Sequence, residues 1–450
     1  MENPIDNREH PWPAPIISWY AVFILFIAYT ISFIDRSILA LLVQPIKADL
    51  NITDTQISLL HGFAFAIFYT ILGIPIARLA DSKSRKHIIA IGIVIWSLMT
   101  CLCGLASKFW HLFLARVGVG VGEAALSPAA YSMIADLFPK ERLGRALGVY
   151  SMGVYFGAGL AFIIGGAVVE AVSHSTTTVV PFVGELKGWQ LVFIIVGLPG
   201  LLAAGLALTI KEPVRRGTKA SDGAVPIAKV IGYARNNWKS FGSHFLGFSI
   251  LGLLFNAFIA WSPTLLIRRF EFTAGEAGYL LGILLLVFGS LGIVCGGLYA
   301  DYLVKRGDSA GTMNAGMRAG IALIPLAALG PIMPSVEWMA VLFAGFYFFA
   351  AFPYGAAAAA LQVISPNRIR AQMSALYLFC LNLLGIGFGP TLVALITDYG
   401  FKDPNAIGQA MAIVGVITAV GGAFVLSRGL KPFRESVVRL DAQTTGREVF

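Results

Sequence analysis

The sequence predicts an all-α integral membrane protein whose twelve transmembrane helices form two six-helix, pseudo-symmetric halves. Composition is the first observation: 57% of the 450 residues are hydrophobic, 13% are charged, and the mean hydropathy is +0.78. A soluble chain carries about 25% charged residues. The second observation is a series of apolar segments long enough to cross a bilayer. The third is a weak internal repeat at matching places in the two halves.

The first six apolar segments predict the helices of the first half. Each reaches the ~20 residues that a transmembrane helix needs, and polar turns separate them. The first segment is too long for a signal peptide, so we expect it to remain as a helix. A cytoplasmic segment over 1–15 is expected to precede a six-helix bundle over 16–210. The predicted spans are 17–46, 55–79, 87–107, 110–137, 144–172 and 189–210.

A polar, basic stretch over 211–239 separates the halves. Within it, Ile227, Ile231 and Ala234 recur at helical spacing, and the basic residues lie largely off that stripe. This pattern is typical of an amphipathic helix on a membrane surface. We therefore expect a cytoplasmic linker that contains one surface helix.

Six further apolar segments predict the second half, a bundle over 240–428. A polar, basic cytoplasmic tail over 429–450 follows it. The predicted spans are 240–267, 275–300, 315–333, 338–364, 371–397 and 405–427.

The distribution of basic residues predicts the orientation. Twelve spans put both termini on one side, which we expect to be the cytoplasm. Most of the 33 Lys and Arg residues then fall in cytoplasmic segments, whereas a few, such as Lys47, Arg268 and Lys402, fall outside. This asymmetry follows the positive-inside rule. It also accounts for the net charge of +9, so we expect no nucleic acid as a partner, and an inner-membrane location if the protein is bacterial.

The four cysteines lie inside apolar segments, at Cys101, Cys103, Cys295 and Cys380. They are typical of small core residues, because they have no other candidate ligands at metal-binding spacing. The sequence contains no His/Cys cluster, and no Ser-His or His-Asp pair near a membrane interface, that would indicate an enzyme. We therefore expect no metal, no cofactor and no catalytic residue.

Charged side chains inside the predicted spans are the strongest functional signal. Asp35 and Arg36 interrupt an apolar run over 16–46, and Glu123 is alone in the run over 117–135. A charge at mid-membrane costs about 2.5 to 3.5 kcal/mol, so each group is expected to find a partner or water. Neighbouring residues point about 100° apart on a helix, so Asp35 and Arg36 are expected to have different partners.

The fourth predicted span carries Arg116, Gly120 and Glu123 on one face, at positions i, i+4 and i+7. At about 1.5 Å per residue, Asp35 and Arg36 lie within about 6 Å of Glu123 in depth. We therefore predict an Arg36–Glu123 pair, with Asp35 left for Arg116, a tyrosine or water. This pair would be either a proton switch, because proton binding by a buried carboxylate depends on a nearby guanidinium, or a structural ion pair.

Short motifs repeat between the halves. Ala80-Asp81 is followed by Arg85-Lys86 after the second span, and Ala300-Asp301 is followed by Lys305-Arg306 after the eighth. Repeated halves predict a substrate site between them near the bilayer midplane, with rocking of the halves for alternating access.

The 6+6 plan, the loop with Asp81, Arg85 and Lys86, and Arg116-x-x-x-Gly120 resemble the major facilitator superfamily. The combination of Asp35-Arg36 on the first span with Glu123 on the fourth is similar to its Spinster branch, which includes sphingolipid and lysophospholipid exporters. The resemblance implies the major facilitator fold and functional roles for Asp35, Arg36 and Glu123. It also implies that Asp81, Arg85 and Lys86 belong to a gating loop.

Candidate substrate contacts in the second half are polar or aromatic residues of the seventh, tenth and eleventh spans, each with packing as the alternative role. They are Asn256, Trp261, Tyr347, Tyr354 and Asn382. Matching repeat positions put Asn256 opposite Asp35, so acidic groups at mid-depth are expected in the first half.

We expect a proton-coupled secondary active transporter of an amphiphilic, lipid-like substrate, with protons as the coupling ion. Glu123 would be the proton site, Arg36 its switchable partner and the substrate anchor, and Asp35 a supporting group. The lipid class of the substrate is implied by the Spinster resemblance. The alternatives are a proton-coupled symporter of a small organic anion and a drug exporter of the same fold. A monomer surrounded by membrane lipids is expected.

Overall fold

The computed structural model describes residues 12–173, 178–180, 184–215, 225–366 and 369–446, and the statements below concern these residues. Within them, twelve helical segments are long and apolar enough to cross a membrane, which confirms the predicted fold class.

The first half contains nine α-helices, one 3-10 turn and a short two-stranded hairpin within the described ranges. They are α1 (Pro15–Ser37), η1 (Ile38–Leu41), α2 (Val43–Leu50), α3 (Asp54–His61), α4 (Phe63–Ser82), α5 (Arg85–Cys103), α6 (Phe109–Glu123), α7 (Leu126–Leu137), α8 (Lys140–Ser173), β1 (Thr178–Val180), β2 (Gly184–Leu186) and α9 (Gly188–Leu208). The hairpin is antiparallel and lies in the segment between the fifth and sixth spans.

The linker and the second half contain the remaining described elements. They are α10 (Ile227–Asn236), α11 (Trp238–Phe270), α12 (Ala274–Leu284), η2 (Leu285–Gly289), α13 (Ser290–Lys305), α14 (Gly311–Leu329), η3 (Gly330–Ile332), α15 (Val336–Ile364), α16 (Arg370–Leu381), η4 (Asn382–Phe388), α17 (Gly389–Leu395), η5 (Ile396–Phe401), η6 (Pro404–Ala406) and α18 (Ile407–Gly446). The predicted tail from 429 therefore continues the last helix of the bundle up to Gly446.

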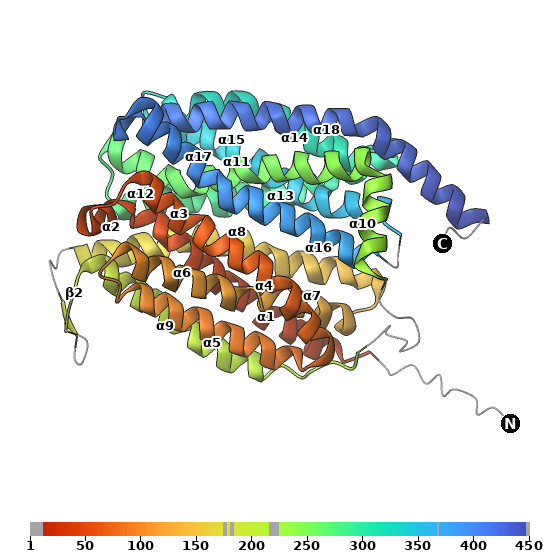
Figure 1. Cartoon of the computed structure of the whole chain (residues 1–450), viewed down its shortest axis with the longest axis horizontal. Helices are drawn as coiled ribbons and strands as arrows, with labels where there is room; N and C mark the ends of the chain where they lie inside the picture. The colour runs from red at the N-terminus through yellow and green to blue at the C-terminus, as the bar shows by residue number, and fades with distance from the viewer. Residues whose placement is uncertain (1–11, 174–177, 181–183, 216–224, 367–368, 447–450) are drawn as a thin grey trace.

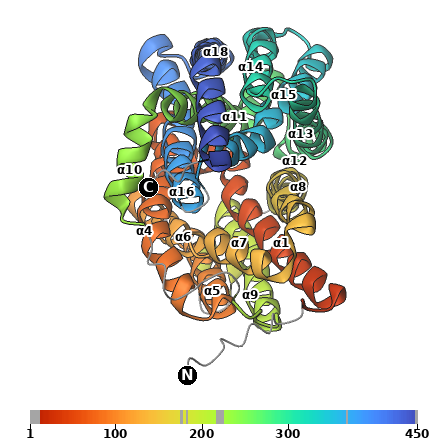
Figure 2. The same cartoon turned by 90° about the vertical axis from the view of Figure 1, so that its right-hand side faces the viewer.

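The two halves lie side by side with their long helices roughly parallel to one axis (Figure 1). The first half is the red-to-yellow layer and the second half is the green-to-blue layer. The end-on view shows α8 beside the second half at α12 and α13, and α4 near α16 (Figure 2). We call the end that carries α10 the linker end and the end that carries β2 the hairpin end.

Two predicted spans of the first half are each built from two α-helices. The span over 110–137 consists of α6 and α7, which meet just after Glu123. The span over 55–79 consists of α3 and α4, which meet at Gly62. A Cβ atom on Gly62 would lie 2.6 Å from the carbonyl oxygen of Gly387 in the other half, so this junction needs glycine for close approach. Glu123, a functional candidate, and Gly62, which contacts the other half, therefore both lie at junctions between helices.

The halves also meet along α8 and α12. A Cβ atom on Gly282 would lie 2.7 Å from the carbonyl oxygen of Gly159, so the two backbones are in direct contact. Small residues allow such close crossings in membrane helices. This seam and the Gly62 junction hold the two halves together on opposite sides of the interface.

The linker helix α10 crosses the ends of the second-half helices (Figure 1). Its Val230 is buried, and the Tyr233 hydroxyl donates a hydrogen bond to the carbonyl of Ile364, 3.4 Å away. Ile231 is exposed. These contacts attach the predicted amphipathic helix to the second half and leave part of its apolar surface outward.

Candidate functional site

The last turn of α1 places Asp35 and Arg36 next to the end of α6. The helix tightens into the 3-10 turn η1 directly after Ser37. Asp35 is fully buried, and Glu123, the last residue of α6, is 2% exposed. The three charged groups therefore point into the protein and not toward surrounding lipid.

Arg36 forms an ion pair with Glu123. The Arg36 guanidinium donates to Oε2 of Glu123, and the Ser32 hydroxyl donates to the same oxygen at 2.6 Å. The Arg36 side chain keeps 16% of its surface exposed, whereas the Glu123 side chain keeps 1%. Arg36 is thus the accessible partner, and Glu123 is the buried one.

Aromatic rings surround the Arg36 guanidinium. Its central carbon lies 4.1 Å from the ring centroid of Phe65, 4.6 Å from that of Phe33 and 5.7 Å from that of Tyr69. A desolvated cation over an aromatic face gains about 2 kcal/mol. The rings therefore stabilise the cation whether or not Glu123 accepts from it.

Arg116 does not bind the Asp35 carboxylate, which was one of the predicted arrangements. Its guanidinium donates to the carbonyl oxygens of Asp35 at 3.2 Å and Arg36 at 3.4 Å, and to that of Leu60 at 3.4 Å. The last carbonyls of a helix have no partner within the helix. Arg116 caps these carbonyl groups at the end of α1, so its guanidinium binds the backbone instead of the Asp35 carboxylate.

Neither carboxylate oxygen of Asp35 has a hydrogen-bond partner among the described residues. An ionised carboxylate buried in this way costs several kcal/mol, and such groups commonly become neutral instead. Asp35 and Glu123 therefore occupy different environments although both are buried. Glu123 has two donors, and Asp35 has none.

Gly120 lies where α6 crosses α4. A Cβ atom at this position would lie 2.6 Å from the carbonyl oxygen of Phe65. The glycine therefore allows Phe65, one of the rings beside Arg36, to approach α6 closely.

The predicted gating loop lies at the linker end. The side chain of Asp81 is outside the described part of the chain. Arg85 is fully buried and forms ion pairs with Asp136 and, at 2.9 Å, with Glu212. Lys86 donates to the carbonyl of Leu208 at 3.4 Å. These contacts join α5 to α7 and to the beginning of the linker, all on the first-half side.

Glu212 lies outside the spans and has a shifted pKa. Burial by itself would raise the pKa, but hydrogen bonds from the Arg85 guanidinium and from the amides of Lys86 and Arg85 lower it below the usual value. Glu212 therefore stabilises the folded protein as an anion.

Two of the predicted substrate contacts form hydrogen bonds within the second half. Trp261 and Tyr347 are fully buried inside the second half. The Trp261 indole donates to the carbonyl of Pro390 at 2.8 Å, and the Tyr347 hydroxyl donates to Ser262 at 3.2 Å. These contacts favour the packing role for both residues, because their polar atoms are satisfied within their own half.

The other three second-half candidates are partly buried. The Tyr354 ring lies 6.3 Å from the ring of Tyr155 on α8, so it takes part in the interface. Asn256 donates to the carbonyl of Gly252 in its own helix at 2.8 Å. Asn382 begins the π-helical segment η4. Such segments are frequent at functional sites.

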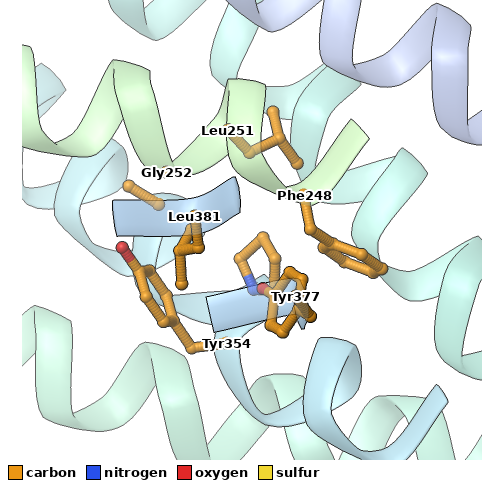
Figure 3. A pocket seen from close by; sticks show the side chains of 8 residues that line it. Phe248, Leu251, Gly252, Tyr354, Tyr377 and Leu381 are labelled. Carbon is orange, nitrogen blue, oxygen red and sulfur yellow. The ribbon is translucent and has the colours of Figure 1, made fainter. Parts of the chain in front are cut away.

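Figure 3 shows an apolar crevice between α11, α15 and α16. Its lining residues are Phe248, Leu251, Gly252, Ala350, Pro353, Tyr354, Tyr377 and Leu381. Its volume is about 10 Å³, which is about the space that one water molecule needs. A larger group would enter only after side chains that line the crevice moved.

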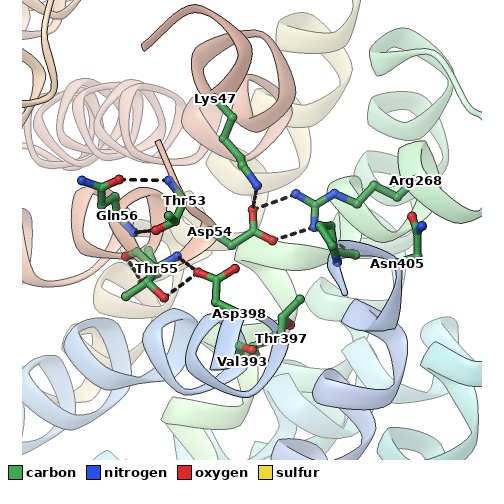
Figure 4. Close-up of polar contacts among 12 residues, drawn as sticks. Lys47, Thr53, Asp54, Thr55, Gln56, Arg268, Val393, Thr397, Asp398 and Asn405 are labelled. Carbon is green, nitrogen blue, oxygen red and sulfur yellow. Dashed lines mark hydrogen bonds and ion pairs between the residues drawn. The ribbon is translucent and has the colours of Figure 1, made fainter. Parts of the chain in front are cut away.

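A polar network that the sequence did not predict joins the halves at the hairpin end (Figure 4). Asp54 accepts two hydrogen bonds from Arg268, both at 2.7 Å, and forms an ion pair with Lys47. Asp398 accepts from the amide and hydroxyl of Thr55, at 2.7 and 2.6 Å. We call these five residues the hairpin-end lock. Its four charged residues were visible in the sequence, but the pairing of Asp54 with Arg268, 214 residues apart, was not.

Comparisons with known proteins agree with this architecture. The Major Facilitator Superfamily model matches residues 25–390. An MFS-type efflux pump of Mycolicibacterium smegmatis is 27% identical, over 96% of this chain and 97% of its own length. A probable L-galactonate transporter of Escherichia coli is 26% identical, over 89% and 87%. The protein spinster of Drosophila melanogaster is 24% identical, over 90% and 67%.

The chain is also similar to a solved structure. A bacterial homolog of the human lysosomal transporter Spinster, in an inward-facing and unoccupied conformation, is 28% identical with a TM-score of 0.73. The match covers 94% of this chain and 98% of the other. The chain therefore belongs to the Major Facilitator Superfamily, and it is a Spinster-like transporter and not an enzyme.

Proposed function

We propose that the protein is a proton-coupled secondary active transporter that moves an amphiphilic, lipid-like substrate by alternating access. The observation that carries this proposal is the buried Glu123 carboxylate, whose guanidinium partner Arg36 is partly exposed. A substrate anion can reach Arg36 without Glu123 itself becoming exposed. Substrate binding and the ionisation of Glu123 are then linked through one guanidinium.

The coupling follows from the cost of an unpaired buried charge. With Arg36 and Ser32 as donors, Glu123 is stable as an anion. If a substrate anion draws Arg36 away, Glu123 is left buried with a single hydroxyl donor. An unpaired buried carboxylate costs several kcal/mol, so Glu123 then takes up a proton. Asp35, which has no donor, holds its proton in the conformation described here.

The two halves differ in a way that suits an amphiphile. The first half buries the charged cluster around Arg36. Among the described residues of the second half, the buried polar side chains are hydroxyls, Asn314 and His244, with no carboxylate or cation. We infer that a charged head group binds to Arg36 and that an apolar chain lies along the second half. The sphingolipid or lysophospholipid class would meet this requirement, as the likeness to Spinster proteins suggests.

A small organic anion is the second candidate substrate. It is favoured by the similarity to a probable L-galactonate transporter, and Arg36 could bind a carboxylate in the same way. Drug export is the third candidate, suggested by the efflux-pump relative. Each candidate keeps the roles of Arg36 and Glu123.

The orientation is also part of the proposal. We propose that the linker end and both termini are cytoplasmic, that a bacterial cell would carry the protein in its inner membrane, and that it acts as a monomer. The excess of basic residues in the predicted cytoplasmic segments supports this orientation.

The test is an exchange assay in proteoliposomes under an imposed pH gradient, with a panel of lysophospholipids, sphingoid lipids and sugar acids. We expect accumulation or loss of a lysolipid that depends on the gradient. Transport of sugar acids alone would replace the lipid proposal by the organic-anion candidate. Transport that ignores the gradient would overturn proton coupling.

A further inference from the structure

Helix α5 presents two polar side chains to α1 at the depth of Asp35. Trp96 and Thr100 are four residues apart, so they share one face of the helix. Both are fully buried. The indole N–H of Trp96 and the hydroxyl of Thr100 have no hydrogen-bond partner among the described residues. Buried donors without partners are rare in proteins and call for an explanation.

The unpartnered carboxyl of Asp35 lies next to these two groups. Thr100 and Trp96 lie close enough to interact with it, and no hydrogen bond joins these groups in this conformation. Three unsatisfied groups from α1 and α5 thus share one buried place. No sequence pattern indicated this cluster, because Trp96 and Thr100 are ordinary residues for an apolar span.

The charged and titratable groups around Asp35 come from three elements. On α6 they are Glu123 and Arg116, of which Arg116 is engaged with backbone carbonyls. On α5 they are Cys101 and Cys103. On α1 itself Arg36 is paired with Glu123. Each cation is therefore already engaged, which leaves the two α5 groups as the available hydrogen-bond partners.

We propose that Trp96 and Thr100 are positioning residues that bind the Asp35 carboxyl and determine how tightly it holds its proton. This inference rests on the proposed function, in which Asp35 carries a proton. It assigns to the third span a part in coupling.

The chemistry of the two groups suits a carboxyl that changes its protonation state. An indole N–H can only donate, whereas a threonine hydroxyl can donate or accept. The protonated carboxyl would donate to the Thr100 oxygen and accept from Trp96. After the proton leaves for water, the Thr100 hydroxyl would turn and donate to the carboxylate. Both states keep two hydrogen bonds, so the proton can leave without stranding a bare charge.

Ser97 provides a matched control on the same helix. It is adjacent to Trp96 and equally buried. Its hydroxyl packs against Gly200 of α9, close to the Trp96 indole nitrogen, and has no hydrogen-bond partner among the described residues. A Ser97→Ala variant removes a buried hydroxyl of α5 that is not one of the two groups assigned to Asp35.

Infrared difference spectroscopy of the purified full-length protein in liposomes tests the proposal without a substrate. The carbonyl band of a protonated carboxyl that disappears in Asp35→Asn is assigned to Asp35, and its amplitude is followed against pH. Trp96→Phe removes a hydrogen-bond donor that stabilises the ionised Asp35 carboxylate more than the protonated Asp35 carboxyl. We expect about a tenfold change in proton affinity, the size of one hydrogen bond to a charged group, together with a shift in band frequency.

Thr100 gives an independent second test. Thr100→Val should move the band and its titration, whereas Thr100→Ser, which keeps the hydroxyl, should restore the wild-type spectrum. Ser97→Ala should leave both unchanged. A band that is assigned to Asp35 but unaffected by Trp96→Phe and Thr100→Val would overturn this inference alone. The lack of any Asp35 band at every pH would overturn the protonated state in the proposed function.

Discussion

Replacing Asp54 by asparagine removes the anion that joins the two halves at the hairpin end. Asp54 is fully buried and accepts two hydrogen bonds from Arg268, whose side chain is 8% exposed. Hydrogen bonds to charged groups contribute about 1.5–3 kcal/mol. The carbonyl of Pro404, 3.0 Å from Arg268, remains as a partner. Because this partner remains, we take 1.5–3 kcal/mol as the stabilisation that the substitution removes from the contact between the halves.

The lock joins the halves in the conformation described here, so its loss should shift the conformational equilibrium. A change of 1.5–3 kcal/mol corresponds to about a 10- to 150-fold change in the ratio of states, because 1.4 kcal/mol is tenfold. Spin labels at Ala48 and Lys402, which are exposed at the hairpin end of opposite halves, report the separation. Double electron–electron resonance spectroscopy should show that a longer distance between the two labels gains population in Asp54→Asn.

Asp49→Asn is the matched control. Asp49 also lies on the first-half side of the hairpin end, but it pairs with Lys187 and accepts from the Trp189 indole at 2.8 Å, both in the same half. Its loss should leave the distance distribution unchanged. The same distribution in Asp54→Asn and the wild type would refute the reasoning, and so would an equal shift in Asp49→Asn.

Three further predictions concern the charged groups of the first half. Glu123→Gln should give transport that no longer depends on pH in proteoliposomes, because the switchable carboxyl is gone; a normal pH profile would remove Glu123 from coupling. Arg36→Ala should weaken substrate binding about tenfold or more at every pH, by loss of a charge-assisted hydrogen bond, and an unchanged apparent affinity would leave Arg36 a structural residue. Arg85→Gln should lower the free energy of unfolding by about 3–5 kcal/mol, because it removes the buried guanidinium that pairs with both Asp136 and Glu212. Thermal unfolding in detergent measures this, with the exposed Lys83→Gln as control, and equal melting of the two variants would contradict it.

The pKa of Glu212 is lowered in the folded state. Its contribution to stability is therefore present above the unfolded pKa and is lost as pH falls through the folded pKa. Glu212→Gln should flatten the acid side of the stability profile, and an unchanged profile would count against this assignment.

The sequence was sufficient for the fold because its signals are local. Each span is a continuous apolar segment, and the depth of Asp35, Arg36 and Glu123 follows from counting residues along two helices. Length and rise per residue fix depth even when the tertiary structure is unknown. The Arg36–Glu123 arrangement in the structure is therefore one that counting could anticipate.

The rest depends on rotation and on contacts between distant segments. Depth does not say which way a side chain faces, so Trp261 and Tyr347 could not be separated from Tyr354 by sequence. Arg116 binds backbone carbonyls because α1 tightens into the 3-10 turn η1 at its end, and no residue pattern in the sequence predicts that turn. The pairing of Asp54 with Arg268 exists only after the two halves assemble.

The most direct test of the account is the number of protons exchanged when substrate binds. A pH-sensitive dye in weakly buffered solution reports proton uptake by the purified protein on addition of a transported substrate. We predict uptake by the wild type that Glu123→Gln removes, while substrate still binds. Equal proton uptake by the wild type and Glu123→Gln would contradict the claim that Arg36 links substrate binding to protonation of Glu123.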